Sequence, residues 1–261
     1  MMPCYVINME KDVKRKENIT NQLDRLGISH TLFRAVNGNA LSAEEMARHY
    51  DKKNAKEKFR ELVPGEIGCA LSHLGIYRDI VEKDLPAAFV LEDDANLIPE
   101  KSKNIPLLSK VLTELGKRFH RDDCKVVLLS YVKRYQKRSC IPLVDNLQLA
   151  DVFGETFLAH AYFITNSAAR SLLENTYPVC LPCDHWHTLQ EMEYIEVKAV
   201  VPYCVGLSEY STESNLEQER VAVAQEQQKK EGFFHFYLYR KFIFQFFVKH
   251  LLALRTQKKT W

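Results

Sequence analysis

Phe89-Val90-Leu91-Glu92-Asp93-Asp94-Ala95 is an apolar run that leads directly into three consecutive carboxylates. The apolar run predicts a buried strand of an α/β sheet. The carboxylates then lie at the carboxyl end of that strand, where open α/β sheets bind their ligands. Three adjacent acids repel one another, and a hard divalent cation such as Mg2+ or Mn2+ relieves that repulsion. The stretch predicts a metal site that holds substrate phosphates, with a solvated acidic turn as the alternative.

Composition indicates a soluble globular protein. The 261 residues are 46% hydrophobic and 27% charged, which suits a chain with a sizeable core. The net charge of +2 argues against a nucleic-acid-binding protein. The first residues lack the basic and apolar segments of a signal peptide, and no run of 18 apolar residues predicts a transmembrane helix.

Seven cysteines are scattered along the chain. Their odd number and irregular spacing indicate reduced thiols in a cytosolic protein. Cys180 and Cys183 form a CxxC motif that His185 and His187 follow closely. A redox pair or a zinc site there is the alternative to ordinary thiols, but a second CxxC motif is missing.

Strand-like and helix-like patterns alternate over the first 212 residues, which predicts an α/β domain. Ser42-Ala43-Glu44-Glu45 is a capping box that begins one short helix, and Asn166 or Ser167 is expected to cap another. We expect strands over residues 4–8, 30–36, 89–92, 125–130, 159–165 and 195–205, and helices over residues 12–26, 64–81, 107–115 and 168–174.

The amino-acid composition of the C-terminal part changes twice. Residues 213–231 are rich in Glu, Gln and Lys and predict a polar helix or linker. Residues 232–261 are basic and aromatic, and over 233–254 they predict an amphipathic helix that binds an anionic membrane surface. The alternative is that these aromatic side chains pack on the catalytic domain or on a second subunit of a homodimer.

Four motifs, in this order, resemble those of glycosyltransferase family 25, the lipooligosaccharide galactosyltransferases. They are Tyr5-Val6-Ile7-Asn8, Phe33-Arg34-Ala35-Val36-Asn37-Gly38, Gly65-Glu66-Ile67-Gly68-Cys69-Ala70-Leu71-Ser72-His73 and Leu91-Glu92-Asp93-Asp94. The resemblance covers about residues 3–210. It implies an α/β GT-A-like, Rossmann-type nucleotide-sugar-binding domain with a mixed sheet.

The resemblance also implies an activity. An enzyme of this kind moves galactose from UDP-galactose, with inversion and in a β-1,4 linkage, to a terminal sugar of lipooligosaccharide. A divalent metal, Mn2+ or Mg2+, assists it, and it works in the cytoplasm on the inner face of a bacterial inner membrane. A glucosyltransferase or another hexosyltransferase of the family is the nearest alternative.

The motifs supply candidate residues for the donor side. Asp94 is the first expected metal ligand, and Glu92 either shares the metal or, like Asp93, contacts the ribose. Asn37 stands where the family usually has Asp, and Glu92-Asp93-Asp94 is not a plain Asp-x-Asp motif. The expected donor-binding residues are Asn8, Arg15, Asn37, Gly65, Ser72, Glu92 and Asp93.

Three residues are candidates for the catalytic chemistry, because inversion needs a base near the acceptor hydroxyl. Asp184 follows a proline-fixed turn and matches the Pro-x-Asp of the family, although it is also placed to cap the next helix. His73 either donates to the donor or acceptor sugar or is a core histidine whose hydrogen bonds are satisfied. Glu66 is either catalytic or a carboxylate that stabilises a helix N-terminus.

Two functions of other classes remain open at this point. Acids at a strand end also serve phosphoryl chemistry, so a metal-dependent phosphohydrolase fits the acidic motif. A non-catalytic glycan-binding module docked on a membrane fits the tail.

Overall fold

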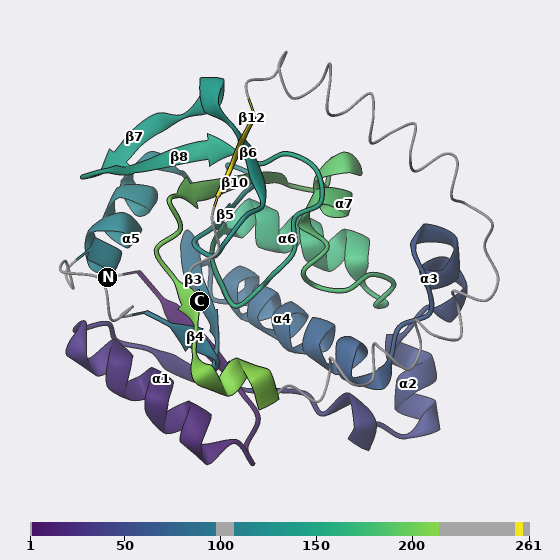
Figure 1. Ribbon diagram of the computed structural model, residues 1–261. Coiled ribbons are helices and arrows are strands. Elements are labelled where there is room, and N and C mark those ends of the chain that lie inside the picture. Colours follow the sequence, from purple (N-terminus) through teal and green to yellow (C-terminus); the bar gives the residue numbers. More distant parts are fainter. Residues whose placement is uncertain (1, 98–106, 214–253, 258–261) are drawn as a thin grey trace.

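An eight-stranded mixed sheet forms the centre of the protein in a computed structural model that describes residues 2–97, 107–213 and 254–257. Figure 1 shows its strands between two groups of helices. In spatial order the strands are β2 (Thr31–Arg34), β1 (Cys4–Asn8), β3 (Ala87–Glu92), β9 (Ala161–Thr165), β5 (Lys125–Leu128), β10 (Glu196–Val201), β8 (Leu147–Asp151) and β7 (Ile141–Val144). The predicted α/β class with a mixed sheet is confirmed.

Strand direction places the acidic motif beside the end of the first strand. β1 pairs in parallel with both β2 and β3, and β9 is antiparallel to its two neighbours β3 and β5. In the β1–β3 register Ile7 lies opposite Glu92. Because parallel strands end at the same sheet edge, Asn8 and the three carboxylates meet there.

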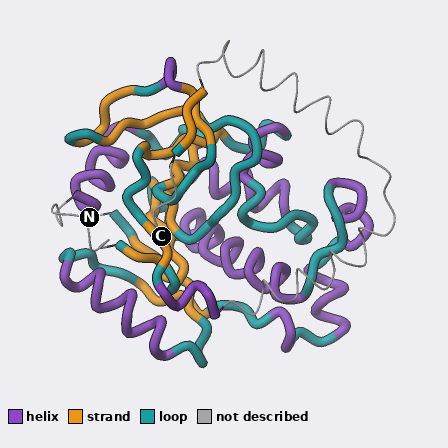
Figure 2. Tube along the Cα trace, in the orientation of Figure 1, coloured by secondary structure: helices purple, strands orange, loops and turns teal. Residues whose placement is uncertain are grey.

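Helices cover both faces of the sheet, as Figures 1 and 2 show. On one face α1 (Val13–Arg25) and α5 (Leu107–Arg118) pack over Phe89 and Leu91 of β3. On the other face α4 (Pro64–Glu82), α6 (Asn166–Thr176) and α7 (Trp186–Glu191) pack over Ala88 and Val90. Successive β3 side chains therefore enter opposite cores, which explains why this strand is apolar at every position up to Glu92.

Several boundaries differ from the predicted ones. A further short helix, α3 (Lys52–Lys58), follows the capping-box helix α2 (Ala43–His49) in a lysine-rich stretch for which a surface loop or a solvated helix is expected. The α6 N-cap is Thr165, so neither Asn166 nor Ser167 caps that helix. The hairpin of β7 and β8 was not predicted, because its strands are short and Pro142 interrupts the apolar pattern of the outer one.

The segment after β10 returns across the acidic motif. β11 (Gly206–Leu207) pairs with β4 (Ala95–Asn96), which follows the three carboxylates directly. The backbone N–H of Ser208 donates to the carbonyl oxygen of Asp94 at 2.8 Å. A short 3-10 helix, η3 (Glu209–Glu213), then lies beside α1, in light green in Figure 1.

Part of the C-terminal segment contacts the α/β domain. β12 (Leu254–Thr256) pairs with β6 (Arg134–Gln136), and Tyr203 N donates to Gln257 Oε1 at 3.2 Å. The β12 residues, which belong to the predicted tail, therefore form a strand that pairs with the domain. The predicted linker over 213–231 and helix over 233–254 fall almost entirely outside the described residues. Within the described ranges, no helix is both long enough and apolar enough to cross a bilayer.

Candidate active site

Asp93, the middle carboxylate, is held by side chains of the first strand and the first helix. Asn8 Nδ2 donates to Asp93 Oδ2 at 2.7 Å, and Arg15 Nη1 donates to Oδ1 at 3.2 Å. Burial raises the pKa of Asp93, while Asn8 and Arg15 oppose that rise. Arg15 Nη2 also donates to the carbonyl oxygen of Tyr210 at 2.5 Å, which joins η3 to the acidic motif. The predicted donor-binding residues Asn8, Arg15 and Asp93 are thus together, and they bind one another.

Asp94 differs from its neighbour. Its Oδ1 atom is buried and has no hydrogen-bond partner among the described residues. Burial and the charge of Glu92 raise the pKa of Asp94 to about 7, although Arg15 opposes the rise. A buried carboxylate oxygen without a donor is unfavourable unless a cation or another partner satisfies it. This oxygen fits the predicted role of Asp94 as a ligand for Mn2+ or Mg2+.

Glu92 is directed to the other side of the site, toward α4. Its Oε1 atom lies 3.2 Å from His73 Nε2 and 4.0 Å from Cys69 Sγ. His73 is fully buried, and its Nδ1 atom lies 2.7 Å from Tyr162 Oη. Burial lowers the pKa of His73, but hydrogen bonds with Cys69 and Glu92 outweigh it and raise that pKa to about 10. His73 thus contacts the acidic motif while both of its ring nitrogens have partners in the core, and its role toward a sugar stays a prediction.

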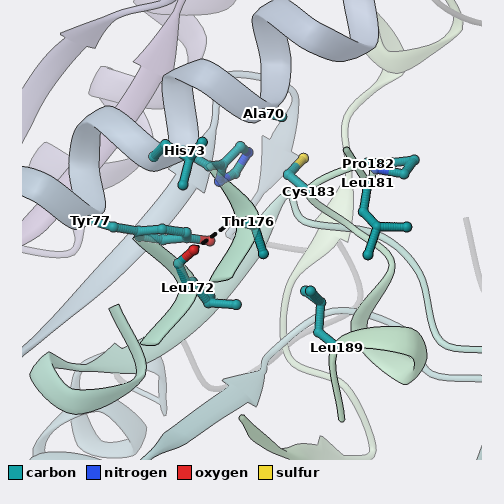
Figure 3. A pocket seen from close by; sticks show the side chains of 10 residues that line it. Ala70, His73, Tyr77, Leu172, Thr176, Leu181, Pro182, Cys183 and Leu189 are labelled. Carbon is teal, nitrogen blue, oxygen red and sulfur yellow. Dashed lines mark hydrogen bonds between the residues drawn. The ribbon is translucent and has the colours of Figure 1, made fainter. Parts of the chain in front are cut away.

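Cys183 completes a group of four side chains around Glu92. Its Sγ atom lies 3.4 Å from Cys69 Sγ, and one ligand atom from each of Cys69, His73, Glu92 and Cys183 lies within 4.8 Å of the others. The hydrogen bond with Cys183 lowers the pKa of Cys69 to about 7, against the effect of burial. Figure 3 shows the Cys183 sulfur and the His73 ring close to one another at the edge of a largely apolar pocket.

The two cysteines of the CxxC motif contact different residues. Cys180 is separate from the group, since its Sγ atom accepts a hydrogen bond from Lys58 Nζ at 3.6 Å. All the cysteines are free thiols in the structure, as predicted. Cys69 and His73 are four residues apart on a helix, so they share one face. This spacing is the feature of the sequence that indicates that Cys69 and His73 lie together. No sequence pattern indicates that Cys183, 114 residues from Cys69, joins them.

Asp184 lies half-buried directly after Cys183. The residue at the N-cap of α7 is His185, so the alternative prediction that Asp184 caps this helix is wrong. Hydrogen bonding to Cys69 and burial raise the pKa of Cys183, and the charge of Asp184 adds to that rise. Asp184 thus lies close to the Glu92 side of the site, and its role as base stays a prediction.

Glu66 makes structural contacts at the beginning of α4. Arg60 donates to both of its oxygens, at 2.8 and 2.7 Å, and Val63 N donates to Oε2 at 3.2 Å. The side chain is almost wholly buried at the N-terminus of α4. A carboxylate in this position stabilises the helix dipole and satisfies a terminal N–H. These contacts favour the structural alternative for Glu66 over the catalytic one.

The second and third sequence motifs pack directly on one another. Ser72 Oγ accepts from Val36 N and donates to Gly68 O, both at 2.8 Å. A Cβ on Gly38 would lie 1.7 Å from the Pro64 carbonyl oxygen, so only glycine fits this contact. Ser72 thus positions the loop and is buried, which leaves it no exposed surface for a donor. Two other predicted donor residues border this contact, exposed Asn37 and half-buried Gly65.

Two exposed aromatic side chains flank the Asp184 turn, and sequence reasoning missed them. Phe59 is 46% exposed and Phe157 is 39% exposed. Their rings lie 4.2 and 5.2 Å, centroid to centroid, from the ring of His185. They come from segments about a hundred residues apart, and neither stands in a periodic pattern that distinguishes it from core residues.

The sequence matches the family described as Glycosyltransferase family 25 (LPS biosynthesis protein) over residues 1–187. "Glycosyltransferase 25 family member" of Drosophila melanogaster is 27% identical over 173 residues, which cover 65% of this chain and 27% of that protein. "Procollagen galactosyltransferase 2" of Homo sapiens is 25% identical over 193 residues, or 70% of this chain and 29% of that protein. "Procollagen galactosyltransferase 1-B" of Xenopus laevis is 30% identical over 191 residues, or 70% and 30%.

The chain thus spans less than a third of the length of these curated relatives. Among solved structures, a mannose-1-phosphate geranyltransferase from Thermus thermophilus has a TM-score of 0.36 and 9% identity. The comparison covers 76% of this chain and 73% of that one, and a score this low supports no inference.

Proposed function

The chain belongs to glycosyltransferase family 25, and from that premise we propose that it transfers galactose from UDP-galactose to a terminal sugar of lipooligosaccharide. The observation that carries the proposal is the buried Asp94 Oδ1 at the carboxyl end of β3, which has no hydrogen-bond partner among the residues that the structure describes. The galactosyltransferase names of two relatives support galactose, and the family description supports the lipopolysaccharide acceptor. The proposed reaction inverts the anomeric carbon and forms a β-1,4 linkage.

On the donor side, Asp94 and Glu92 would hold Mn2+ or Mg2+, and Asp94 has the better-placed oxygen. When bound, such an ion supplies Lewis-acid assistance to the departing diphosphate. Asn8, Arg15 and Asp93 fix the backbone that carries Asp94, because their polar groups are satisfied by one another. We assign these three residues to positioning and place the nucleotide against the neighbouring loop of Asn37.

On the acceptor side, Asp184 takes the proton from the attacking hydroxyl group. Its turn is adjacent to the rings of Phe59 and Phe157, whose exposed faces offer an apolar surface to the carbon–hydrogen face of a sugar. A pocket with a few polar groups beside aromatic surface is typical of small-molecule sites. We propose that the acceptor binds beside Asp184 and the donor beside Asp94.

The proposed division of the chain puts the catalytic domain at residues 1–212. The basic aromatic segment beyond residue 232 would hold the enzyme on the anionic inner face of the bacterial membrane, where a glycolipid acceptor is anchored. The pairing of β12 with β6 anchors the end of this segment to the domain. Vesicle sedimentation with the full chain and with a chain ending at residue 231 tests the attachment.

Turnover with UDP-galactose, Mn2+ and a lactose-type or glucose-terminated acceptor tests the function. UDP release that requires the acceptor supports a transferase. Phosphate release without acceptor would instead indicate a phosphohydrolase, and binding without turnover a glycan-binding module. Replacing UDP-galactose with UDP-glucose distinguishes the galactosyltransferase from the glucosyltransferase.

A further inference from the structure

We propose that Cys69, His73, Glu92 and Cys183 bind one zinc ion. The four side chains come from three separated parts of the chain: helix α4, the end of β3 and the turn before α7. This site goes beyond the proposed transfer reaction: when zinc is bound, Glu92 coordinates the zinc, and Asp94 alone remains as the carboxylate ligand for the Mn2+ or Mg2+ of the transfer reaction. A positive or a negative result for zinc therefore leaves the transferase proposal to its own test.

The spacing of the ligand atoms fits a tetrahedral ion. Cys69 Sγ and Cys183 Sγ are 3.4 Å apart, and His73 Nε2 and Glu92 Oε1 are 3.2 Å apart. With Zn–S bonds of about 2.3 Å and Zn–N or Zn–O bonds of about 2.0–2.1 Å, tetrahedral ligands lie about 3.3–3.8 Å from one another. Small side-chain rotations would therefore be enough to centre an ion among these atoms.

The types of ligand select zinc over the cations expected at Asp94. Two thiolates and an imidazole are soft or borderline donors, which bind zinc in preference to Mg2+ or Mn2+. Four protein ligands also close the coordination sphere, as in structural zinc sites. The acidic motif thus divides between two kinds of metal chemistry, with Glu92 in the group of the thiols and Asp94 outside it.

A buried hydrogen-bond chain orients the histidine ligand. His73 Nδ1 lies 2.7 Å from Tyr162 Oη, which lies 2.9 Å from Tyr77 Oη. If His73 Nδ1 carries the proton and donates it to Tyr162, the lone pair of Nε2 is available to the metal. Such support of the second ring nitrogen is a regular feature of histidine ligands in metal sites. All three residues are buried, so water does not compete for these bonds.

The charges of the ligands also favour a bound cation. Two thiolates and one carboxylate would bring three negative charges close together on half-buried side chains, and a divalent cation among them offsets much of their repulsion. Zinc binding would release the protons of the thiols, because the metal is bound by thiolates. A disulfide between Cys69 and Cys183 is the competing arrangement, but it would need an oxidant and would not account for His73 and Glu92.

The zinc would connect the two sides of the active site. Cys183 immediately precedes Asp184, and Glu92 begins the acidic motif. An ion bound to both fixes the turn of the proposed base relative to the strand that carries the donor-side carboxylates. Its role in catalysis would be positional, through these neighbours.

Metal analysis of the full chain, purified without chelators in the presence of zinc, tests the proposal. We expect one zinc ion per chain, and loss of that zinc in Cys69→Ser and in Cys183→Ser. Cys180→Ser is the matched control, because Cys180 belongs to the same CxxC motif but contacts Lys58, and it should retain the ion. Cobalt replacement should give a thiolate-to-cobalt charge-transfer band in the wild type and in the Cys180 variant alone.

A measurement on the wild-type protein covers the case in which the serine variants fail to fold. Removing zinc with a chelator should lower the thermal midpoint, and adding zinc, but not Mg2+ or Mn2+, should restore it. Protein without stoichiometric zinc, or zinc retained in the Cys69 and Cys183 variants, would overturn the proposal. An intact mass that shows a Cys69–Cys183 disulfide in the freshly purified chain would also overturn it.

Discussion

Asn8 and Asp93 join the ends of the first and third strands: Asn8 Nδ2 donates to Asp93 Oδ2 at 2.7 Å. The β1–β3 register sets this pair, because Ile7 lies opposite Glu92 one position earlier. Both side chains are more than nine-tenths buried. The contact fixes the middle carboxylate, which leaves Glu92 and Asp94 to face different parts of the site.

Asn8→Ala should destabilise the fold. The change leaves a buried carboxylate oxygen without one of its donors, which costs about 1–3 kcal/mol. Urea unfolding measures the loss. Asn175→Ala is the control, since its amide makes an exposed hydrogen bond to Ser171 O and its removal should change stability by less than about 0.5 kcal/mol. Equal effects of the two substitutions would refute the structural role of Asn8.

Asp94→Asn should stabilise the fold at pH 8 in buffers without added divalent ions. The folded-state pKa of Asp94 is about 7, above its ordinary value of 3.8, mainly because of burial. The folded state therefore holds a proton that the unfolded state has lost, and wild-type stability should fall as pH rises from about 4 to about 7. Asn stays neutral and removes this loss.

Unfolding free energies of both proteins at pH 5 and pH 8 measure this effect. The advantage of the variant should be on the order of 1 kcal/mol or more at pH 8 and smaller at pH 5. An advantage that is equal at the two values of pH would show that Asp94 does not titrate in this range.

Asp184→Asn should lower kcat by about 10²–10⁴, as expected for loss of a general base. The KM for UDP-galactose should change little, because the acceptor side of the site holds Asp184. Asp145→Asn, in the turn of the β7–β8 hairpin, is the control and should keep wild-type kinetics. Loss of donor binding with turnover preserved would move Asp184 to the donor pocket.

Phe59→Ala and Phe157→Ala should each raise the KM for the acceptor by about 3–10-fold, the equivalent of about 0.5–1.5 kcal/mol of ring contact. The KM for the donor should stay the same. Ile141→Ala removes an equally exposed apolar side chain on β7 and should affect neither constant. Steady-state kinetics that vary one substrate at a time make the comparison, and unchanged acceptor KM values would place the acceptor elsewhere.

Periodicity was enough to predict the central elements of the fold. Buried strands such as Ala87–Glu92 and helices such as Pro64–Glu82 are marked by unbroken or helical apolar patterns. The outer hairpin was missed because edge strands need less apolar sequence and carry Pro142. The position of the acids after a predicted strand was enough to predict which edge of the sheet carries the site.

The different contacts of the three acids could not be predicted from the sequence. It depends on partners that the chain brings from far away: Tyr210 lies 195 residues from Arg15, and Cys183 lies 114 residues from Cys69. Adjacent carboxylates have the same chemistry in a sequence and acquire different roles only from such neighbours. Glu66 illustrates the same point, because its contacts with Arg60 and with the backbone N–H of Val63 favour a helix cap over a catalytic acid.

Acceptor-dependent UDP release from UDP-galactose, measured with Mn2+ for the wild type and for Asp94→Asn, tests the central claim most directly. The wild type should release UDP only when both acceptor and Mn2+ are present, and the folded variant should fall below about a tenth of that rate, since its neutral amide lacks the carboxylate charge that holds the ion. Wild-type turnover by Asp94→Asn, or phosphate release without acceptor, would contradict the account.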